Sequence, residues 1–75
     1  GIDIYPNPAN NLIDVFAKFI VEEVSVYSME GKKMSDKVIG KNKFSIDLTD
    51  FSQGAYFLVF KTKSTDLITK RIVKK

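Results

Sequence analysis

The side chains that could do chemistry in this chain carry hydroxyl, carboxylate or amine groups. Its 75 residues include no cysteine and no histidine, so no thiol and no imidazole is present. A serine nucleophile would need an activating base, for which only lysine is present. No pattern places a lysine beside any of the candidate serines, which are Ser45, Ser52 and Ser64. Asp3, Asp47 and Asp50 supply oxygen ligands but lack the spacing of an EF-hand calcium loop, and aspartate is common in turns. We therefore expect no enzyme, no cofactor and no metal site.

The cationic side chains gather at the end of the sequence. Residues 61–75 hold six lysines and arginines against one aspartate, a net charge of +5, whereas residues 1–60 hold six lysines against eight acids, a net charge of −2. A basic segment can meet an acidic receptor, an anionic surface or nucleic acid, or it can be an edge strand whose lysines discourage aggregation. Nucleic acid is the weakest of these partners and we expect no binding to it, because stacking platforms need interleaved aromatics and none follows Phe60.

These groups must be positioned by β-strands, since short runs of alternating apolar and polar residues recur about every ten residues. Hydrophobic residues make up 44% and charged residues 28% of the chain, which is ordinary globular composition. The predicted strands are 2–5, 11–17, 22–29, 31–40, 43–49, 54–62 and 67–74. We expect one domain over residues 1–75, an all-β antiparallel immunoglobulin-like sandwich of about seven strands with Greek-key connections. Its predicted core is Ile13, Val15, Val24, Val26, Phe44, Ile46, Leu48, Tyr56, Leu58, Phe60 and Ile72.

Local signals add detail to this fold. The segment 14–26 has a mixed spacing that could suit a helix, but it is rich in Val and Ile and lacks a preceding cap, so we favour a strand. Turns are predicted around Gly31, at 40–43 and at 64–66. Tyr56 lies two residues after Gly54 at a strand corner. A tyrosine there can bond back to the upstream backbone, as in the tyrosine corner of immunoglobulin-like sandwiches.

The opening of the chain is stiff. Pro6 and Pro8 fix φ near −65°, and the residues before them are driven to extended geometry. The longest purely apolar run is 55–60, so we expect no membrane insertion. No basic region followed by a long apolar one marks the start as a signal peptide, so an export address would have to lie upstream.

Four blocks of residues span almost the whole chain. The opening block is Tyr5-Pro6-Asn7-Pro8-Ala9 followed by Ile13-x-Val15. The central block is Val24-x-Val26-Tyr27-x-x-x-Gly31-Lys32. The third block is Ile46-Asp47-Leu48 with Phe51 and Gly54-x-Tyr56-Phe57-Leu58, and the last is Lys70-x-x-Val73-Lys74. In this order and at this spacing, the four blocks resemble the type A C-terminal sorting domain of the type IX secretion system.

The resemblance implies a transport signal. It implies export to the periplasm, followed by recognition of the folded domain by the type IX machinery in the outer membrane of Bacteroidetes-like bacteria. It also implies removal by a sortase-like cysteine protease, with the cargo ending at the cell surface or outside the cell. The implied partners are the machinery, this protease and an upstream cargo domain of the same chain. Weak self-association is left open.

We expect recognition on the last predicted strand, where ordered cations would speed encounter with an acidic partner and an unpaired edge could join a receptor sheet. The predicted recognition residues are Lys70, Arg71, Val73, Lys74 and Lys75. The predicted scaffold residues are Pro6, Asn7, Pro8, Gly31, Gly54 and Tyr56. The alternative function is an immunoglobulin-like adhesion or carbohydrate-binding module attached to a secreted enzyme, which predicts exposed aromatics such as Phe16, Tyr27 or Phe51.

Overall fold

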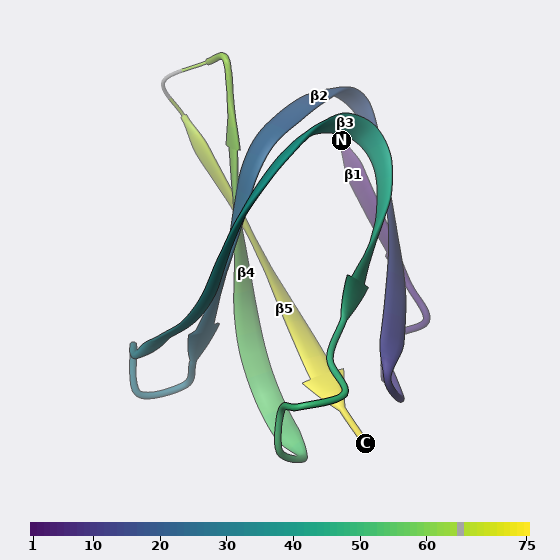
Figure 1. The fold of residues 1–75 in the computed structure, drawn as a ribbon, viewed down its shortest axis with the longest axis vertical. Coiled ribbons are helices and arrows are strands. Elements are labelled where there is room, and N and C mark those ends of the chain that lie inside the picture. The colour runs from purple at the N-terminus through teal and green to yellow at the C-terminus, as the bar shows by residue number, and fades with distance from the viewer. Residues whose placement is uncertain (65) are drawn as a thin grey trace.

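Five antiparallel strands form one strongly curled sheet in the computed structural model, which describes residues 1–64 and 66–75 (Figure 1). The strands are β1 (Ile2–Tyr5), β2 (Leu12–Ser28), β3 (Lys33–Asp47), β4 (Gly54–Thr62) and β5 (Leu67–Lys74). The predicted all-β antiparallel fold is confirmed, and β1, β4 and β5 have the bounds that the sequence predicts. The predicted turn at 64–66 includes residue 65, which lies outside the described residues.

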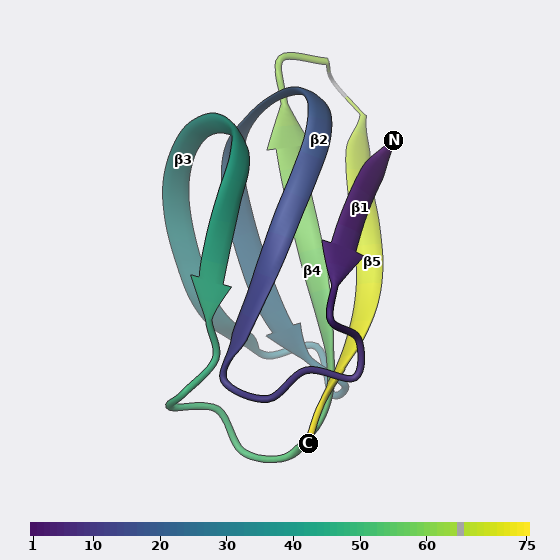
Figure 2. The same cartoon turned by 90° about the vertical axis from the view of Figure 1, so that its right-hand side faces the viewer.

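β2 is the strand that organises the sheet. β3 follows one edge of β2 as a long antiparallel hairpin, with Leu12 opposite Asp47 at one end and Tyr27 opposite Lys33 at the other. The other edge of β2 pairs with β1 along its first half and with β4 along its second half, and β5 pairs with β4. The β2–β3 ribbon arches so that its two halves face each other (Figures 1 and 2).

This arch explains why the predicted count of seven strands is wrong. The predicted strands 11–17 and 22–29 are the two halves of β2, and 31–40 and 43–49 are the two halves of β3. The pairing of β2 shifts register between Phe16 and Val21 and again between Val21 and Glu23. Such bulges bend and twist a strand without ending it. The immunoglobulin-like and Greek-key features are not confirmed, because the sheet follows one path, β1-β2-β4-β5, with β3 beside β2.

Glycine marks the bend of β3 and the turn before it. Gly40 has a φ of 70°, a conformation that glycine adopts without steric cost, and it bends β3 where the sequence predicted a turn. Gly31 lies in the confirmed turn between β2 and β3, where its N–H donates to the carbonyl oxygen of Ser28 at 3.0 Å. The scaffold role predicted for Gly31 is therefore local to this turn.

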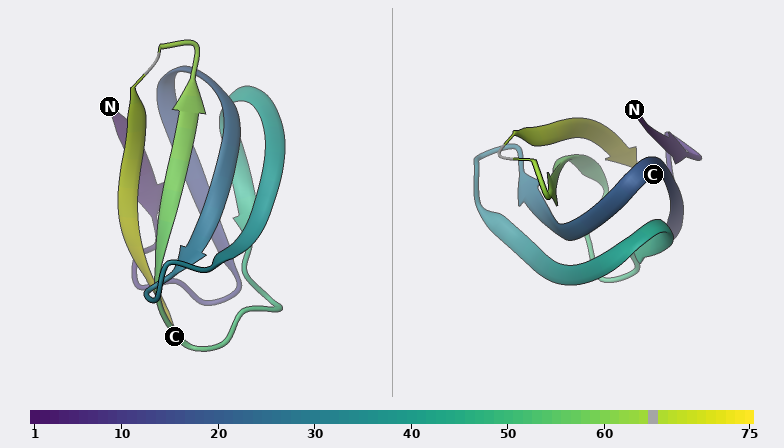
Figure 3. Two further views of the ribbon diagram at one scale, coloured as in Figure 1. Left: turned by 90° about the vertical axis from the view of Figure 1, so that its left-hand side faces the viewer. Right: turned by 90° about the horizontal axis from the view of Figure 1, so that it is seen from above.

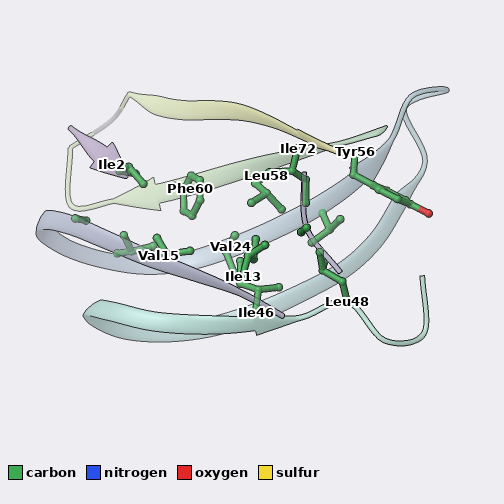
Figure 4. Packing of buried hydrophobic residues seen from close by; sticks show 14 residues of the cluster. Ile2, Ile13, Val15, Val24, Ile46, Leu48, Tyr56, Leu58, Phe60 and Ile72 are labelled. Carbon is green, nitrogen blue, oxygen red and sulfur yellow. The ribbon is translucent and has the colours of Figure 1, made fainter. Parts of the chain in front are cut away.

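The core fills the space that the curled sheet encloses (Figures 3 and 4). In β2 the inward residues are odd-numbered before the bend, as at Ile13 and Val15, and even-numbered after it, as at Val24 and Val26. The register shifts thus keep the apolar side inward through the bend. All predicted core residues are buried except Phe44, which is half-buried and packs against the others. The core also includes residues that were not predicted, namely Ile2, Ala9, Ala17 and Val21.

Candidate recognition site

The start of the chain and the end of β5 lie side by side. The N–H of Ala9 donates to the carbonyl oxygen of Val73 at 2.8 Å, and the N–H of Lys75 donates to the carbonyl oxygen of Ala9 at 2.8 Å. These bonds make a parallel bridge between Ala9 and Lys74. Ala9 is fully buried at this contact, where a larger side chain would overpack the site. Residues 7–9 therefore cover the outer edge of β5 over its last residues.

The side chain of Asn7 extends this pairing. Its Nδ2 donates to the carbonyl oxygen of Arg71 at 3.2 Å, and its Oδ1 accepts a bond from the N–H of Val73 at 3.1 Å. A side-chain amide carries the same donor and acceptor groups as a peptide unit, so Asn7 pairs with β5 as a strand residue would. The peptide bonds preceding the flanking prolines, Pro6 and Pro8, are both cis.

Lys74 joins the end of β5 to the loop between β3 and β4. Its side chain is only 7% exposed, and its Nζ donates to the carbonyl oxygens of Leu48 at 2.6 Å, Thr49 at 3.2 Å and Phe51 at 2.6 Å. An ammonium group has three N–H donors, so all of them are used inside the protein. Charge-assisted bonds of this kind are roughly twice as strong as neutral ones. We call the contacts of residues 7–9 with β5, together with those of Lys74 with residues 48–51, the terminal clasp.

The structure divides the predicted recognition residues into two groups. Lys70, Arg71 and Lys75 are exposed and Val73 is half-buried, whereas Lys74 is buried with its charge turned inward. Residues two apart on a strand share a face, so Lys70, Ile72 and Lys74 share one face of β5, on which Ile72 and Lys74 are buried and Lys70 is exposed. The prediction grouped Lys74 with the other cations because it considered their charge and not the face of the strand on which each lies.

Gly54 and Tyr56 lie directly beside the clasp on β4. Gly54 pairs with Lys74 across the β4–β5 ladder and has a φ of 146°, a region that residues with a side chain rarely adopt. The hydroxyl of Tyr56 donates to the carbonyl oxygen of Ser52 at 2.7 Å, and its ring packs against Phe51 with 5.3 Å between centroids. Figure 4 shows this ring in the core with its oxygen at the edge. The predicted tyrosine contact is confirmed, and it fixes the same loop that Lys74 binds.

The exposed cations of β5 form no ion pair with the residues that the structure describes. Neither Lys70 nor Arg71 has a carboxylate oxygen within 4 Å among residues 1–64 and 66–75. The ion pairs in that part of the chain lie elsewhere, on β2, β3 and β4. The charges of Lys70 and Arg71 therefore face solvent, where they can meet an acidic partner.

Asp47 closes a tight turn at the start of the loop that Lys74 binds. Its carboxylate accepts bonds from the hydroxyl of Thr49 and from the N–H of Thr49, the latter at 2.9 Å. These bonds, with a smaller contribution from the charges of Lys37 and Lys74, lower the pKa of Asp47 below its ordinary 3.8. Aspartate commonly fixes turns in this way, so its predicted role as a turn residue is confirmed.

Two of the candidate serines hold structural hydrogen bonds. The hydroxyl of Ser45 donates to Asp14 at 2.6 Å across the β2–β3 ladder, and the oxygen of Ser64 accepts the N–H of Asp66 at 3.2 Å. In the described parts of the chain, no three histidine, cysteine, aspartate or glutamate side chains are grouped so that they could hold a metal ion. No helix in these parts is long and apolar enough to span a membrane.

The aromatic residues that a carbohydrate platform would need are partly covered. Phe16 stacks on Tyr5 with 5.3 Å between ring centroids, and Phe51 packs on the tyrosine of the corner. Tyr27 lies under the ammonium group of a lysine on β3, 5.9 Å from its ring centroid. All three candidates are half-buried. The alternative function is therefore not favoured.

The model of the family described as the secretion system C-terminal sorting domain matches residues 3–75 of the chain. The match includes all the residues that form the terminal clasp. No curated protein matches the chain at a significant level.

Proposed function

Because the chain belongs to the family of secretion system C-terminal sorting domains, we propose that the exposed side chains of β5 are the surface by which the secretion machinery recognises it. The family establishes the general role, which is that of a type IX sorting signal. Such a domain directs an upstream cargo through the outer membrane to the cell surface or the extracellular space, and it is typical of Bacteroidetes. The family is one of signals and not of catalysts.

The proposal also includes the individual steps of transport. The domain folds in the periplasm, meets the machinery as a folded unit, and is removed by a sortase-like protease at the surface. The burial of the core inside one curled sheet supports recognition in the folded state, because only the folded chain holds the cations of β5 in fixed positions. A surface that is already ordered loses less entropy when it binds.

The observation that carries the proposal is the unpaired charge of an ordered strand. Lys70 and Arg71 on β5 and Lys75 directly after it are exposed near Val73, and the strand is hydrogen-bonded to β4 on one side and to residues 7–9 on the other. Cations held in this way raise the rate of encounter with an acidic partner. Lys74 has a supporting role, since its charge is bound by loop carbonyls.

The test is export of a periplasmic reporter fused to the domain in a host with type IX secretion. The pair Lys70→Glu and Arg71→Glu reverses two exposed charges, and the matched control reverses two exposed lysines of β3, Lys41→Glu and Lys43→Glu. We expect export to fall about tenfold or more for the first pair, equivalent to about 1.4 kcal/mol of recognition, and to persist for the control. Equal export of both fusions, with equal melting temperatures, would refute recognition through β5. Deletion of residues 66–75 is unsuitable because it removes β5 and the clasp.

A further inference from the structure

The outer edge of β5 is covered by the chain itself over only part of its length. Backbone groups of Arg71 and Val73 on this edge are bonded by residues 7–9. Alternate residues of a strand direct their backbone groups to the same edge, so those of Leu67 and Thr69 face it too. Within the described residues, the first part of β5 has no strand partner on this side. No Cα atom of β1 comes within 8 Å of β5, whereas paired strands lie about 4.8 Å apart.

An apolar groove of about 530 Å³ lies beside this free edge. Its apolar wall comes from Phe19 and Ile20 at the bend of β2 and from Ile68 of β5. The polar residues that complete the lining come from the end of β4 and the segment after it, and they are Thr62, Lys63, Ser64 and Asp66. Ile20 is 44% exposed. The bend of β2 and the start of β5 both lie toward the top of Figure 1, at the opposite end of β5 from the clasp.

We propose that the free part of β5 and this groove together bind an extended segment of a protein of the secretion machinery. The segment pairs with the backbone of β5 at Leu67 and Thr69 and places an apolar side chain in the groove against Ile68. Unpaired strand edges bind extended peptides through main-chain bonds, while adjacent pockets select alternate side chains. This inference rests on the proposed function, which supplies the class of partner.

The charges around the edge specify the segment further. Residues 61–75 carry a net charge of +5, and Lys63 and Lys70 are both exposed. Ile68 and Lys70 are two residues apart and share a face of β5, so an apolar wall is followed directly by a cation. A matching strand would carry an apolar and an acidic side chain two positions apart. The free backbone edge favours such a polypeptide over a lipid or a glycan, neither of which can continue the ladder.

Two substitutions test the edge and the groove separately in the reporter fusion. Thr69→Pro removes an outward N–H, which edge strands tolerate, and its ring blocks pairing on that side. Ile20→Lys places a charge in the groove at a half-exposed position, and Val38→Lys is its matched control, because Val38 is an apolar side chain on β3 that is 84% exposed. We expect export to fall about tenfold for each test variant and to persist for the control, with all three proteins folded. If Thr69→Pro unfolds the domain, Ile20→Lys alone decides the outcome.

The outcomes for the sorting function and for the docking site are distinct. Failure of the unchanged fusion to leave the cell would overturn the sorting function itself. Export of the unchanged fusion together with full export of folded Ile20→Lys would overturn the docking site and leave the sorting function in place. A dimer of the purified domain, or its binding to phospholipid vesicles, that is lost in Ile20→Lys would also overturn the inference by assigning the groove to a second copy or to lipid.

A photoreactive benzoylphenylalanine gives a direct readout of the partner. Leu67 is 62% exposed at the free edge, and Val38 again supplies the control position. During export, the probe at position 67 should crosslink to an extended segment of one type IX machinery protein, identified by mass spectrometry, and the probe at position 38 should not. Equal crosslinking from both positions would overturn the inference.

Discussion

Replacement of Lys74 by methionine tests whether the terminal clasp stabilises the domain. Methionine keeps a long flexible side chain that can occupy the space of the lysine stem, and it removes only the ammonium group. The carbonyl oxygen of Leu48 retains a bond from the N–H of Phe51 at 3.0 Å. The carbonyl oxygens of Thr49 and Phe51 are only partly buried and can turn to water. The variant therefore loses strong bonds without leaving all three acceptors unpaired.

The expected loss of unfolding free energy is about 2–3 kcal/mol. Hydrogen bonds to charged groups contribute roughly 1.5–3 kcal/mol each, and the cost of burying the lysine charge offsets part of the two 2.6 Å bonds. A domain of 75 residues has a total stability of roughly 4–11 kcal/mol, so this loss is a large part of it. The melting temperature should fall by roughly 10–20 °C.

Urea denaturation of the isolated domain, followed by circular dichroism, measures this loss. The matched control is Lys75→Met, the same change at the neighbouring exposed lysine, which should alter stability by less than about 0.5 kcal/mol. Hydrogen exchange should report faster exchange of the Phe51 amide in Lys74→Met only. Equal unfolding free energies for the two variants, with unchanged exchange at Phe51, would refute the structural role of Lys74.

Three further predictions concern the bonds around the clasp and the loop. Asn7→Asp keeps the acceptor for Val73 but replaces the donor with a carboxylate oxygen, so stability should fall by about 1–2 kcal/mol in urea melts, and Asn7→Ala should match or exceed that loss. Tyr56→Phe removes the hydroxyl bond to the loop and should cost about 0.5–1.5 kcal/mol in the same assay, with near-native circular dichroism. The pKa of Asp47 is lowered on folding, so its contribution is complete above pH 3.8 and is lost as the pH falls through the folded pKa. The difference in stability between the unchanged domain and Asp47→Asn should therefore shrink in melts below about pH 3.8, and a difference that stays constant on acidification would contradict this role.

The sequence predicted the short strands of the fold correctly, but it did not predict that β2 and β3 continue through their bends. β1, β4 and β5 are short alternating runs between turn residues, which period-2 patterns identify directly. Within β2 the buried positions change from odd-numbered to even-numbered residues between Val21 and Val24, where the pairing shifts register. In a sequence, such a bulge cannot be told from the end of one strand and the start of another. The same ambiguity at Gly40 split β3 into two predicted strands.

Recognition through β5 stays a prediction, but the structure shows which contacts of its residues could be foreseen from the sequence. The opening motif and the basic final strand were identified separately, and nothing local in a sequence encodes a bond between positions 64 residues apart, as between Asn7 and Arg71. Charge alone grouped Lys74 with its exposed neighbours, although Lys74 lies two residues after the core residue Ile72 and so shares its face of β5. Tyr56 was predicted correctly because its bond is short-range, reaching only four residues back to Ser52.

The clasp can form only after synthesis of the domain is complete, because it joins the start of the domain to its last residues. Asn7 bonds with residues that follow it by 64 and 66 positions, and Lys74 binds a loop made more than 20 residues earlier. Native contacts of such high contact order form late, and a ribosome supplies them only after everything before them has been translated. A chain that stops before residue 70 lacks Lys70 and Arg71, and it also lacks the bonds that hold the end of β5 in place. A protein truncated before this point would therefore lack the surface proposed for recognition, and its cargo would not be exported.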